Sequence, residues 1–452
     1  MTHQPWERLD NASNIFLAAR TDSDPKVFRV TAELKHNVDQ AILQQAVDEV
    51  YDRYPLYHAV LRRGVFWHYL QDSTLRPEVT TEQLPTCAPI YDSGRRTLLF
   101  RVTHYRQRIN LEVFHALSDG TGALWFLTDV IAAYLQRHDP QPAEASTENQ
   151  QTSLIQELTR DSFAEYFRPK HPSKKRARPP WKTDTTETDL RQPKTRKTTY
   201  FKGAYRIKGT RTPDHRTRLI ELTVPAKPIL ALAHGESVSP TIYLTAMFFE
   251  ALRTAAQPVG QSMTYGASIP VNLRQFFPST SARNFFATVR IEHTYGSGDN
   301  DGVGCVARHL EQQFRTKATP EALETKLRRF SRFERMVAVR VVPRQIKDVL
   351  LRWINWGNNR GLTVAVSNLG RVNLPDPIEP FVHRMAFHVT AVRPQFCVMT
   401  HAGMMTISFT SPYVETDHVR EFARHLRSLG VPVSVAAPRV TEEHLASVDE
   451  AQ

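Results

Sequence analysis

An alternating stretch that runs into a glycine-rich turn occupies residues 109–122, with the sequence INLEVFHALSDGTG. Its apolar residues alternate up to His115, which is the period of a strand with one buried face. Gly120 and Gly122 then interrupt the pattern, and residues 123–136 carry an apolar stripe at helical spacing. We therefore expect His115 at the carboxyl end of a strand, directly before a helix, where many α/β proteins place their chemistry.

Strands and helices alternate over both halves of the chain. In the first half a strand is expected at 28–34, a helix at 38–52 that Pro55 ends, and a pair of strands at 97–105 and 109–115. No close sequence repeat relates the halves, but their similar content predicts an α/β fold (α+β sandwich type) of two lobes. In the second half we expect strands at 218–224, 264–269, 287–293, 362–367, 384–392 and 396–409, and helices at 240–256 and 416–429.

The composition changes at residues 139–212, where Pro, Thr, Gln and basic residues dominate. A short amphipathic helix is expected near 154–167, and a basic cluster occupies 174–182. A solvated linker face explains this cluster, and a nucleic-acid or nuclear-import patch is the alternative. We interpret the segment as a partly mobile crossover between lobes. The predicted division is a first lobe at 1–150, a basic linker at 151–212 and a second lobe at 213–452.

The net charge of +12 favours anionic partners, whether nucleic acid, anionic lipid or a phosphorylated cofactor. The sequence contains no zinc-finger spacing, RRM-like aromatic run or heptad-bearing basic region, so nucleic acid is not expected. The aromatic and basic stretch at 352–360 lacks the repeated interleaving that single-strand binding requires, and it is interpreted as an amphipathic helix.

The cysteines Cys87, Cys305 and Cys397 lie far apart and form no CxxC pair. A disulfide framework and a metal site are therefore not expected, and a reducing compartment fits. The first 20 residues lack the apolar core of a signal peptide, and no stretch approaches the roughly 18 apolar residues that span a bilayer. We expect a cytoplasmic protein without a membrane span.

His115 suits a reaction that needs a base near neutrality, because the usual pKa of histidine is close to neutral pH. In acyl transfer from a thioester, a base accepts the proton of the attacking alcohol or amine. The thiol is itself a good leaving group, so a base and an oxyanion donor suffice. The sequence lacks the Gly-x-Ser-x-Gly elbow and a recognisable nucleophilic cysteine, which favours direct attack without an acyl-enzyme. A structural histidine before a turn is the alternative.

The segment from His115 to Gly120 resembles the HxxxDG signature of the coenzyme A-dependent acyltransferase superfamily. That superfamily includes chloramphenicol acetyltransferase, peptide-synthetase condensation domains and the alcohol acetyltransferase-like proteins. Four further segments match the superfamily: Tyr54-Pro55 with Leu61-Arg62, Ile269-Pro-Val-Asn-Leu-Arg274, Asn284-Phe-Phe286 and Val366-Ser-Asn-Leu-Gly370. The last three of these segments are most similar to the alcohol acetyltransferase-like branch.

The resemblance implies a role for each matching residue. His115 would deprotonate the acceptor, while Asp119 would point away from the substrate and pair with an arginine, for which Arg62 matches the position. Gly120 would leave room for the pantetheine arm, and its lack of a side chain also permits a backbone conformation closed to other residues. Phe114 stands where condensation domains often have a first histidine, which argues against amide-forming peptide synthesis.

The motifs of the second half allow two interpretations each. Ser367 and Asn368 are candidates for a group near the oxyanion, and a strand that ends in a polar turn is the alternative. Asn272 and Arg274 are candidates for lining the channel or binding cofactor phosphate, although a plain structural loop is favoured.

The resemblance thus implies two chloramphenicol acetyltransferase-like lobes with a channel between them, in which acyl-coenzyme A and a small alcohol or amine reach His115. Acyl-coenzyme A would be a co-substrate, with no permanently bound cofactor and no metal. One rival is a condensation-type enzyme that takes acyl chains from a carrier protein. A second rival is a binding protein that keeps the fold without activity, against which the intact His115, Asp119, Gly120 and Arg62 weigh.

Overall fold

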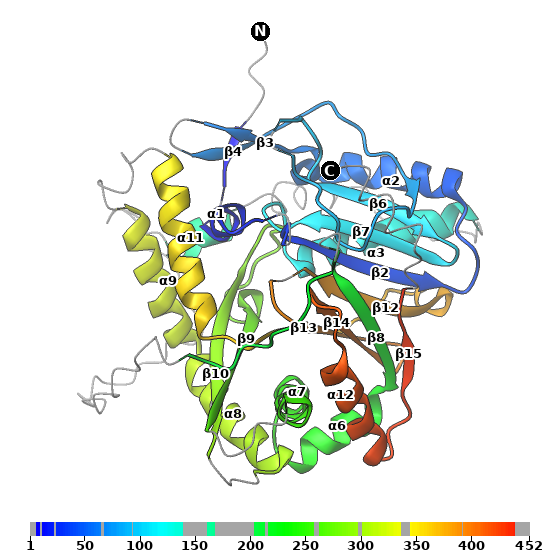
Figure 1. Cartoon of the computed structure of the whole chain (residues 1–452). Coiled ribbons are helices and arrows are strands. Elements are labelled where there is room, and N and C mark those ends of the chain that lie inside the picture. The colour runs from blue at the N-terminus through cyan, green and yellow to red at the C-terminus, as the bar shows by residue number, and fades with distance from the viewer. Residues whose placement is uncertain are drawn as a thin grey trace, which may run out of the picture.

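A computed structural model shows the fold of the protein. Its two main parts are lobes that pack against each other (Figure 1). Each lobe has a hydrophobic core of its own, and each core lies between a sheet and its helices. The structure describes residues 6–9, 11–21, 24–64, 67–92, 94–138, 161–167, 203–212, 216–256, 262–296, 301–335, 344–390 and 392–438.

The first lobe is built on a five-stranded sheet in the order β12-β2-β7-β6-β5. Its pairs are antiparallel except β5–β6, and helices α2 and α3 lie together against it (Figure 1). Asp39 caps α2 by accepting from the backbone N–H groups of Ala41 and Ile42, as expected for a helix at this place. The elements are β2 (Val27–Leu34), α2 (Gln40–Arg53), the 3-10 helix Pro55–His58, β5 (Thr80–Thr81), β6 (Phe100–Tyr105), β7 (Arg108–Phe114), α3 (Gly120–His138) and β12 (Val382–Val389).

The second lobe is built on a seven-stranded sheet in the order β10-β9-β11-β13-β14-β8-β15. Strand β11 is parallel to β9 and β13, and the other pairs are antiparallel. Helices α6, α7, α8 and α12 pack together beside this sheet (Figure 1). The elements are β8 (Arg218–Pro225), α6 (Ala226–Gly235), α7 (Pro240–Ala256), β9 (Met263–Asn272), the 3-10 helix Leu273–Gln275, β10 (Phe286–Tyr295), α8 (Val303–Lys317), β11 (Val364–Arg371), the 3-10 helix Glu379–Phe381, β13 (Gln395–His401), β14 (Met404–Ser411), α12 (Asp417–Ser428) and β15 (Ser434–Ala436).

Strand β12 belongs by sequence to the second half of the chain but pairs with β2 of the first sheet. A single boundary at residue 213 therefore does not follow the division of the sheets. On β12, Arg384 Nη1 lies 3.1 Å from the Glu221 carboxylate of β8, and His388 Nε2 lies 2.8 Å from the same carboxylate. Glu221 and His388 are buried, so these contacts join the sheets across their interface.

Smaller elements complete the described chain. A three-stranded sheet in the order β1-β4-β3 lies beside α1 at the top of Figure 1, and α9 and α11 form one side of the molecule. These elements are β1 (Trp6–Arg8), α1 (Asn11–Ala18), β3 (Val60–Arg63), β4 (His68–Gln71), α5 (Ser162–Phe167), α9 (Pro320–Arg335) and α11 (Arg344–Arg360).

Most of the predicted strands and helices are confirmed, but the strand predicted at 396–409 is wrong. The structure divides it into the hairpin of β13 and β14. Ala402 and Gly403 form the turn with φ angles of 48° and 77°, the left-handed region in which glycine is favoured. Because the strands on both sides are apolar, the short turn does not interrupt the hydrophobic pattern strongly.

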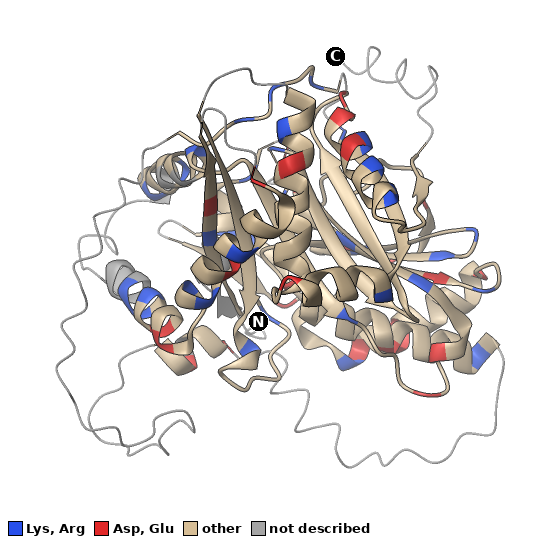
Figure 2. Ribbon diagram, turned by 90° about the horizontal axis from the view of Figure 1, so that it is seen from below, with Lys and Arg blue, Asp and Glu red and all other residues tan. Residues whose placement is uncertain are grey.

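Most of the predicted linker, including the basic cluster at 174–182, lies outside the described residues. The described part at 203–212 runs along the second lobe, where Tyr205 N donates to Thr264 O over 2.7 Å. No described helix is both long and apolar enough to cross a bilayer. Figure 2 shows basic and acidic residues interspersed over the helices on one side of the molecule.

Candidate active site

His115 lies immediately after the last residue of β7 and five residues before Gly120, at which α3 begins. Its backbone N–H donates to Lys26 O over 2.8 Å, which fixes the end of the strand. The flanking Phe114 and Ala116 are buried, whereas His115 is half-buried. The predicted junction of strand and helix is therefore confirmed.

Aromatic rings surround the imidazole of His115. Phe16 of α1 stacks on it with centroids 4.0 Å apart, Phe28 of β2 meets it edge-on at 4.9 Å, and Phe286 of β10 lies at 5.7 Å. Burial in these surroundings lowers the pKa of His115 to about 4, although Asp119 and the hydrogen bond to Asn284 act in the opposite direction. The imidazole is therefore neutral at physiological pH, which is the form a general base needs.

Asn284 determines which nitrogen of His115 is available as a base. The amide nitrogen of Asn284 donates to His115 O over 2.8 Å and to Ser13 Oγ over 3.0 Å, so its oxygen faces His115 Nδ1 at 3.2 Å. An amide oxygen only accepts, so this network assigns the proton to Nδ1. Nε2 then carries the lone pair, and in the described part of the chain it has no hydrogen-bond partner.

Asp119 accepts hydrogen bonds with both of its carboxylate oxygens. Its Oδ1 accepts from Gly122 N over 3.0 Å and thereby caps α3. Its Oδ2 accepts from Arg274 Nη1 over 2.8 Å and from Phe285 N over 2.9 Å. Both oxygens are thus engaged, and the second ties α3 to the segment that presents Asn284 to His115.

The prediction that Arg62 pairs with Asp119 is wrong. Arg62 lies exposed on β3, in register with Tyr69 of β4, and Asp119 pairs with Arg274 instead. The Arg274 guanidinium also donates to Ser281 O over 2.6 Å and to Arg283 O over 2.8 Å. A charge buried with its partner and with further acceptors is the arrangement that a low-dielectric site requires.

Asn272 lies beside this ion pair. Its Oδ1 accepts from Arg274 N over 3.0 Å at the start of the 3-10 helix, and its Nδ2 donates to Thr121 Oγ1 over 3.3 Å. These contacts agree with the structural interpretation that the sequence favoured for Asn272 and Arg274.

Ser367 and Asn368 lie on β11 next to an irregularity in its pairing with β13. Asn368 Nδ2 donates to Thr241 Oγ1 of α7 over 2.7 Å, and Asn368 Oδ1 accepts from Gly370 N over 2.6 Å. Among the described residues no hydrogen bond joins either side chain to His115, so their role near an oxyanion stays a prediction.

Gly120 and Gly122 are required by close packing and not by an unusual backbone. The backbone freedom that glycine permits is not used at Gly120, because among the described glycines positive φ occurs at Gly370, Gly403 and Gly430. A Cβ at Gly120 would lie 2.8 Å from the side chain of Leu369. At Gly122 a Cβ would lie 2.2 Å from the backbone oxygen of Ala282, a contact between the two lobes.

Replacing Gly122 with alanine is expected to destabilise the protein by about 1–3 kcal/mol, the usual cost of overpacking. The reason is that the Ala282 carbonyl and Ser118 Oγ, 2.2 and 2.5 Å from the added Cβ, must both move. Gly235→Ala is the control, because no atom lies within 4 Å of its Cβ. Urea unfolding measures both variants, and equal stabilities would contradict the packing argument.

The pH dependence of activity should reflect the lowered pKa of His115, about 4. We expect kcat/KM to stay level as the pH falls from about 8 to about 5, and to decline only below that, because the neutral base persists. The unfolded chain takes up this proton near pH 6.5, so the contribution of His115 to stability is lost as the pH falls from there towards 4. A pH–rate profile restricted to conditions where circular dichroism shows folded protein checks this, and an acid limb near pH 6.5 would contradict it.

Sequence reasoning missed two groups that contact His115 directly. Asn284 occurs in the quoted Asn284-Phe-Phe286 motif, but its contact with His115 spans 169 residues and has no local signal. Phe16 lies in a short helix without a distinctive pattern, and only the fold places it on the imidazole.

No family model and no curated protein matches the chain. Solved structures match it over most of its length. Polyketide synthase associated protein 5 from Mycobacterium tuberculosis is 12% identical with a TM-score of 0.56, covering 93% of this chain and 97% of that one. TRI3 trichothecene 15-O-acetyltransferase from Fusarium sporotrichioides is 9% identical with a TM-score of 0.59, covering 94% of each chain.

A further match is TRI101 from F. sporotrichioides, complexed with coenzyme A and T-2, at 9% identity and a TM-score of 0.59, covering 95% of this chain and 99% of that one. The EpoB cyclization-docking bidomain from Sorangium cellulosum also matches, at 12% identity and a TM-score of 0.55, over 94% of this chain and 85% of the other. At these identities the likeness concerns the fold. The chain has the fold of the coenzyme A-dependent acyltransferase and condensation-domain superfamily, which confirms at that level the resemblance inferred from its sequence.

Proposed function

We propose that this protein transfers an acyl group from acyl-coenzyme A to a hydroxyl acceptor, with His115 as the general base. The observation that carries the proposal is the Nδ1 contact with Asn284, 3.2 Å long, which leaves the lone pair on Nε2. A neutral imidazole held in one tautomer is what direct attack on a thioester requires.

The reaction follows from this placement. Nε2 accepts the hydroxyl proton as the acceptor oxygen attacks the thioester carbonyl, which forms a tetrahedral intermediate. The intermediate collapses by breaking the carbon–sulfur bond, and the departing thiolate takes the proton back from Nε2. Asp119 and Arg274 hold α3 and the Asn284 segment in register.

An arginine without an ion-pair partner among the described residues supports an anionic donor. Arg393 lies in the loop that follows β12 and begins at Thr390. The backbone N–H of Thr390 donates to Val27 O, and the preceding carbonyl, Lys26 O, accepts from the backbone N–H of His115. Burial, and then the neighbouring charge of Arg206, lower the pKa of Arg393 to about 10. In the described part of the chain Arg393 forms no ion pair, so a phosphate of coenzyme A is a suitable counter-ion.

Arg393→Ala is expected to raise KM for acyl-coenzyme A about 10-fold with little change in kcat, because a phosphate contact contributes equally to ground and transition states. Stability should be unchanged or higher, since the substitution removes an unpaired charge. Steady-state kinetics measure the effect. Arg95→Ala, whose side chain is 82% exposed, is the matched control. An unchanged KM for Arg393→Ala would contradict this role.

The proposed function is tested with the full chain, acetyl- and longer acyl-coenzyme A donors, and a panel of alcohols and amines, by following release of the free thiol. We expect acceptor-dependent thiol release with alcohols. Turnover with acylated carrier protein but with no coenzyme A donor would overturn the donor and favour the condensation-type rival. Absence of turnover with both donors would favour a binding protein of the same fold.

A further inference from the structure

Helix α11 presents an apolar stripe away from the body of the protein. The residues recur at intervals of three and four, so they share one face of the helix. A stripe of this kind normally faces a core, and its exposure therefore calls for an external partner. Its members and their exposed fractions are Ile346 (60%), Val349 (53%), Leu350 (47%), Trp353 (72%) and Trp356 (54%).

The side of α11 next to the stripe is anchored to the first lobe. Arg352 Nε donates to Ala18 O at the end of α1 over 3.2 Å. Lys347 Nζ lies 5.2 Å from the centroid of Trp67, on the hairpin of β3 and β4, and Trp67 is itself 37% exposed. The helix thus rests on the protein with its stripe outward, at the side of the molecule seen at the left of Figure 1.

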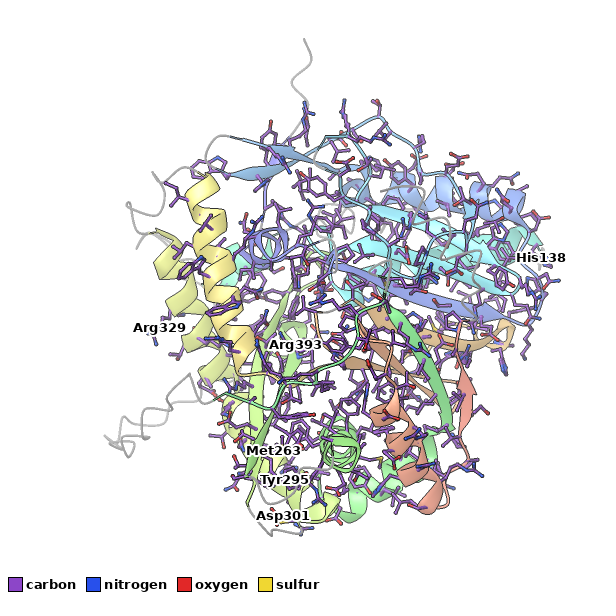
Figure 3. All side chains as sticks on the ribbon, viewed as in Figure 1. His138, Met263, Tyr295, Asp301, Arg329 and Arg393 are labelled. Atoms are coloured by element: carbon purple, nitrogen blue, oxygen red, sulfur yellow. The ribbon has the colours of Figure 1, made fainter. Side chains whose placement is uncertain are left out.

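Positive charges border the stripe. Arg352 and Arg360 are exposed, and Arg360 lies over the Trp356 ring at 4.0 Å. Arg329 of α9 lies at the left edge of the molecule in Figure 3, the side on which α11 also lies in Figure 1. The sequence of α11, RQIKDVLLRWINWGNNR, contains four basic residues and one acidic residue.

We propose that α11 docks the protein on an anionic lipid surface. A helix with tryptophan on an apolar face and basic residues at its margins is suited to lie in the plane of a membrane interface. Tryptophan prefers the depth of the lipid headgroups, and the arginines match the negative charge of the leaflet. The proposal does not depend on acyl transfer.

Sedimentation of the full chain with large vesicles tests the proposal. Vesicles of phosphatidylcholine alone are compared with vesicles that contain about 30% phosphatidylglycerol, at low and high salt. We expect binding to the anionic vesicles at least about 10-fold tighter than to the neutral ones, and weaker binding at high salt, because the electrostatic part is screened. The double variant Trp353→Glu/Trp356→Glu should lose at least about 10-fold of that affinity.

Leu84→Glu/Leu230→Glu is the matched control, since Leu84 in the loop after β5 is 56% exposed and Leu230 on α6 is 48% exposed. It adds the same charge and should bind vesicles like the wild type, and circular dichroism verifies that both variants fold. Failure of the wild type to bind anionic vesicles would overturn the proposal, as would equal losses in both double variants. A dimer in light scattering that only the tryptophan substitutions dissociate would also overturn it, because a second copy would then cover the stripe.

Discussion

Replacing His115 with alanine is expected to lower kcat/KM for acyl transfer by at least about 100-fold, the scale of losing a general base. The reason is that Nε2 is the acceptor that the Asn284 contact leaves available. Alanine also leaves space among Phe16, Phe28 and Phe286, which by itself costs stability. The thermal midpoint therefore has to be measured together with the rate.

Two further variants separate chemistry from packing. His115→Gln fills much of the space but cannot take up the proton, so we expect it to lose activity like alanine with a smaller change in stability. His104→Ala, at a half-buried position on β6, is the control histidine and should leave the rate unchanged. Retention of full activity in His115→Gln would refute the assignment of His115 as the base.

The local elements around His115 could be predicted because they depend on neighbours in the sequence. Alternation up to His115 indicates β7, and the stripe after Gly122 indicates α3. The crossing of β12 into the first sheet could not be predicted, since it pairs Phe387 with Val30 over more than 350 residues. Pairing at such a separation depends on which surfaces remain uncovered after both lobes form, and alternation does not encode it.

The candidate site also has a part that the sequence predicts and a part that it does not. His115 and Asp119 are recognisable from their spacing and from the turn between them. The choice between Arg62 and Arg274 as the partner of Asp119 is different, because both residues are single arginines in short motifs. Only the packing of the lobes, with the Ala282 backbone against Gly122, brings Arg274 to within 2.8 Å of Asp119.

Arg274→Met is expected to destabilise the protein by about 3–5 kcal/mol, because it leaves the Asp119 carboxylate buried without its cation. The side chains of Arg274 and Asp119 are 8% and 6% exposed. Activity should also fall, because Phe285 N and the Asn284 segment are held through the same Asp119 oxygen. Denaturant unfolding and steady-state kinetics measure the two effects.

A double-mutant cycle with Asp119→Asn distinguishes an ion pair from two independent supports. Removing both charges should cost less than the sum of the single variants, since neither partner is then left charged and buried. Asp52→Asn is the matched control, because the Asp52–Arg76 pair has both side chains 57% exposed and should contribute only about 0–1 kcal/mol. Strictly additive losses at Asp119 and Arg274 would contradict the coupling. Coupling in stability together with loss of activity in both single variants would mean that the pair positions Asn284, and through it the His115 tautomer, from the opposite lobe.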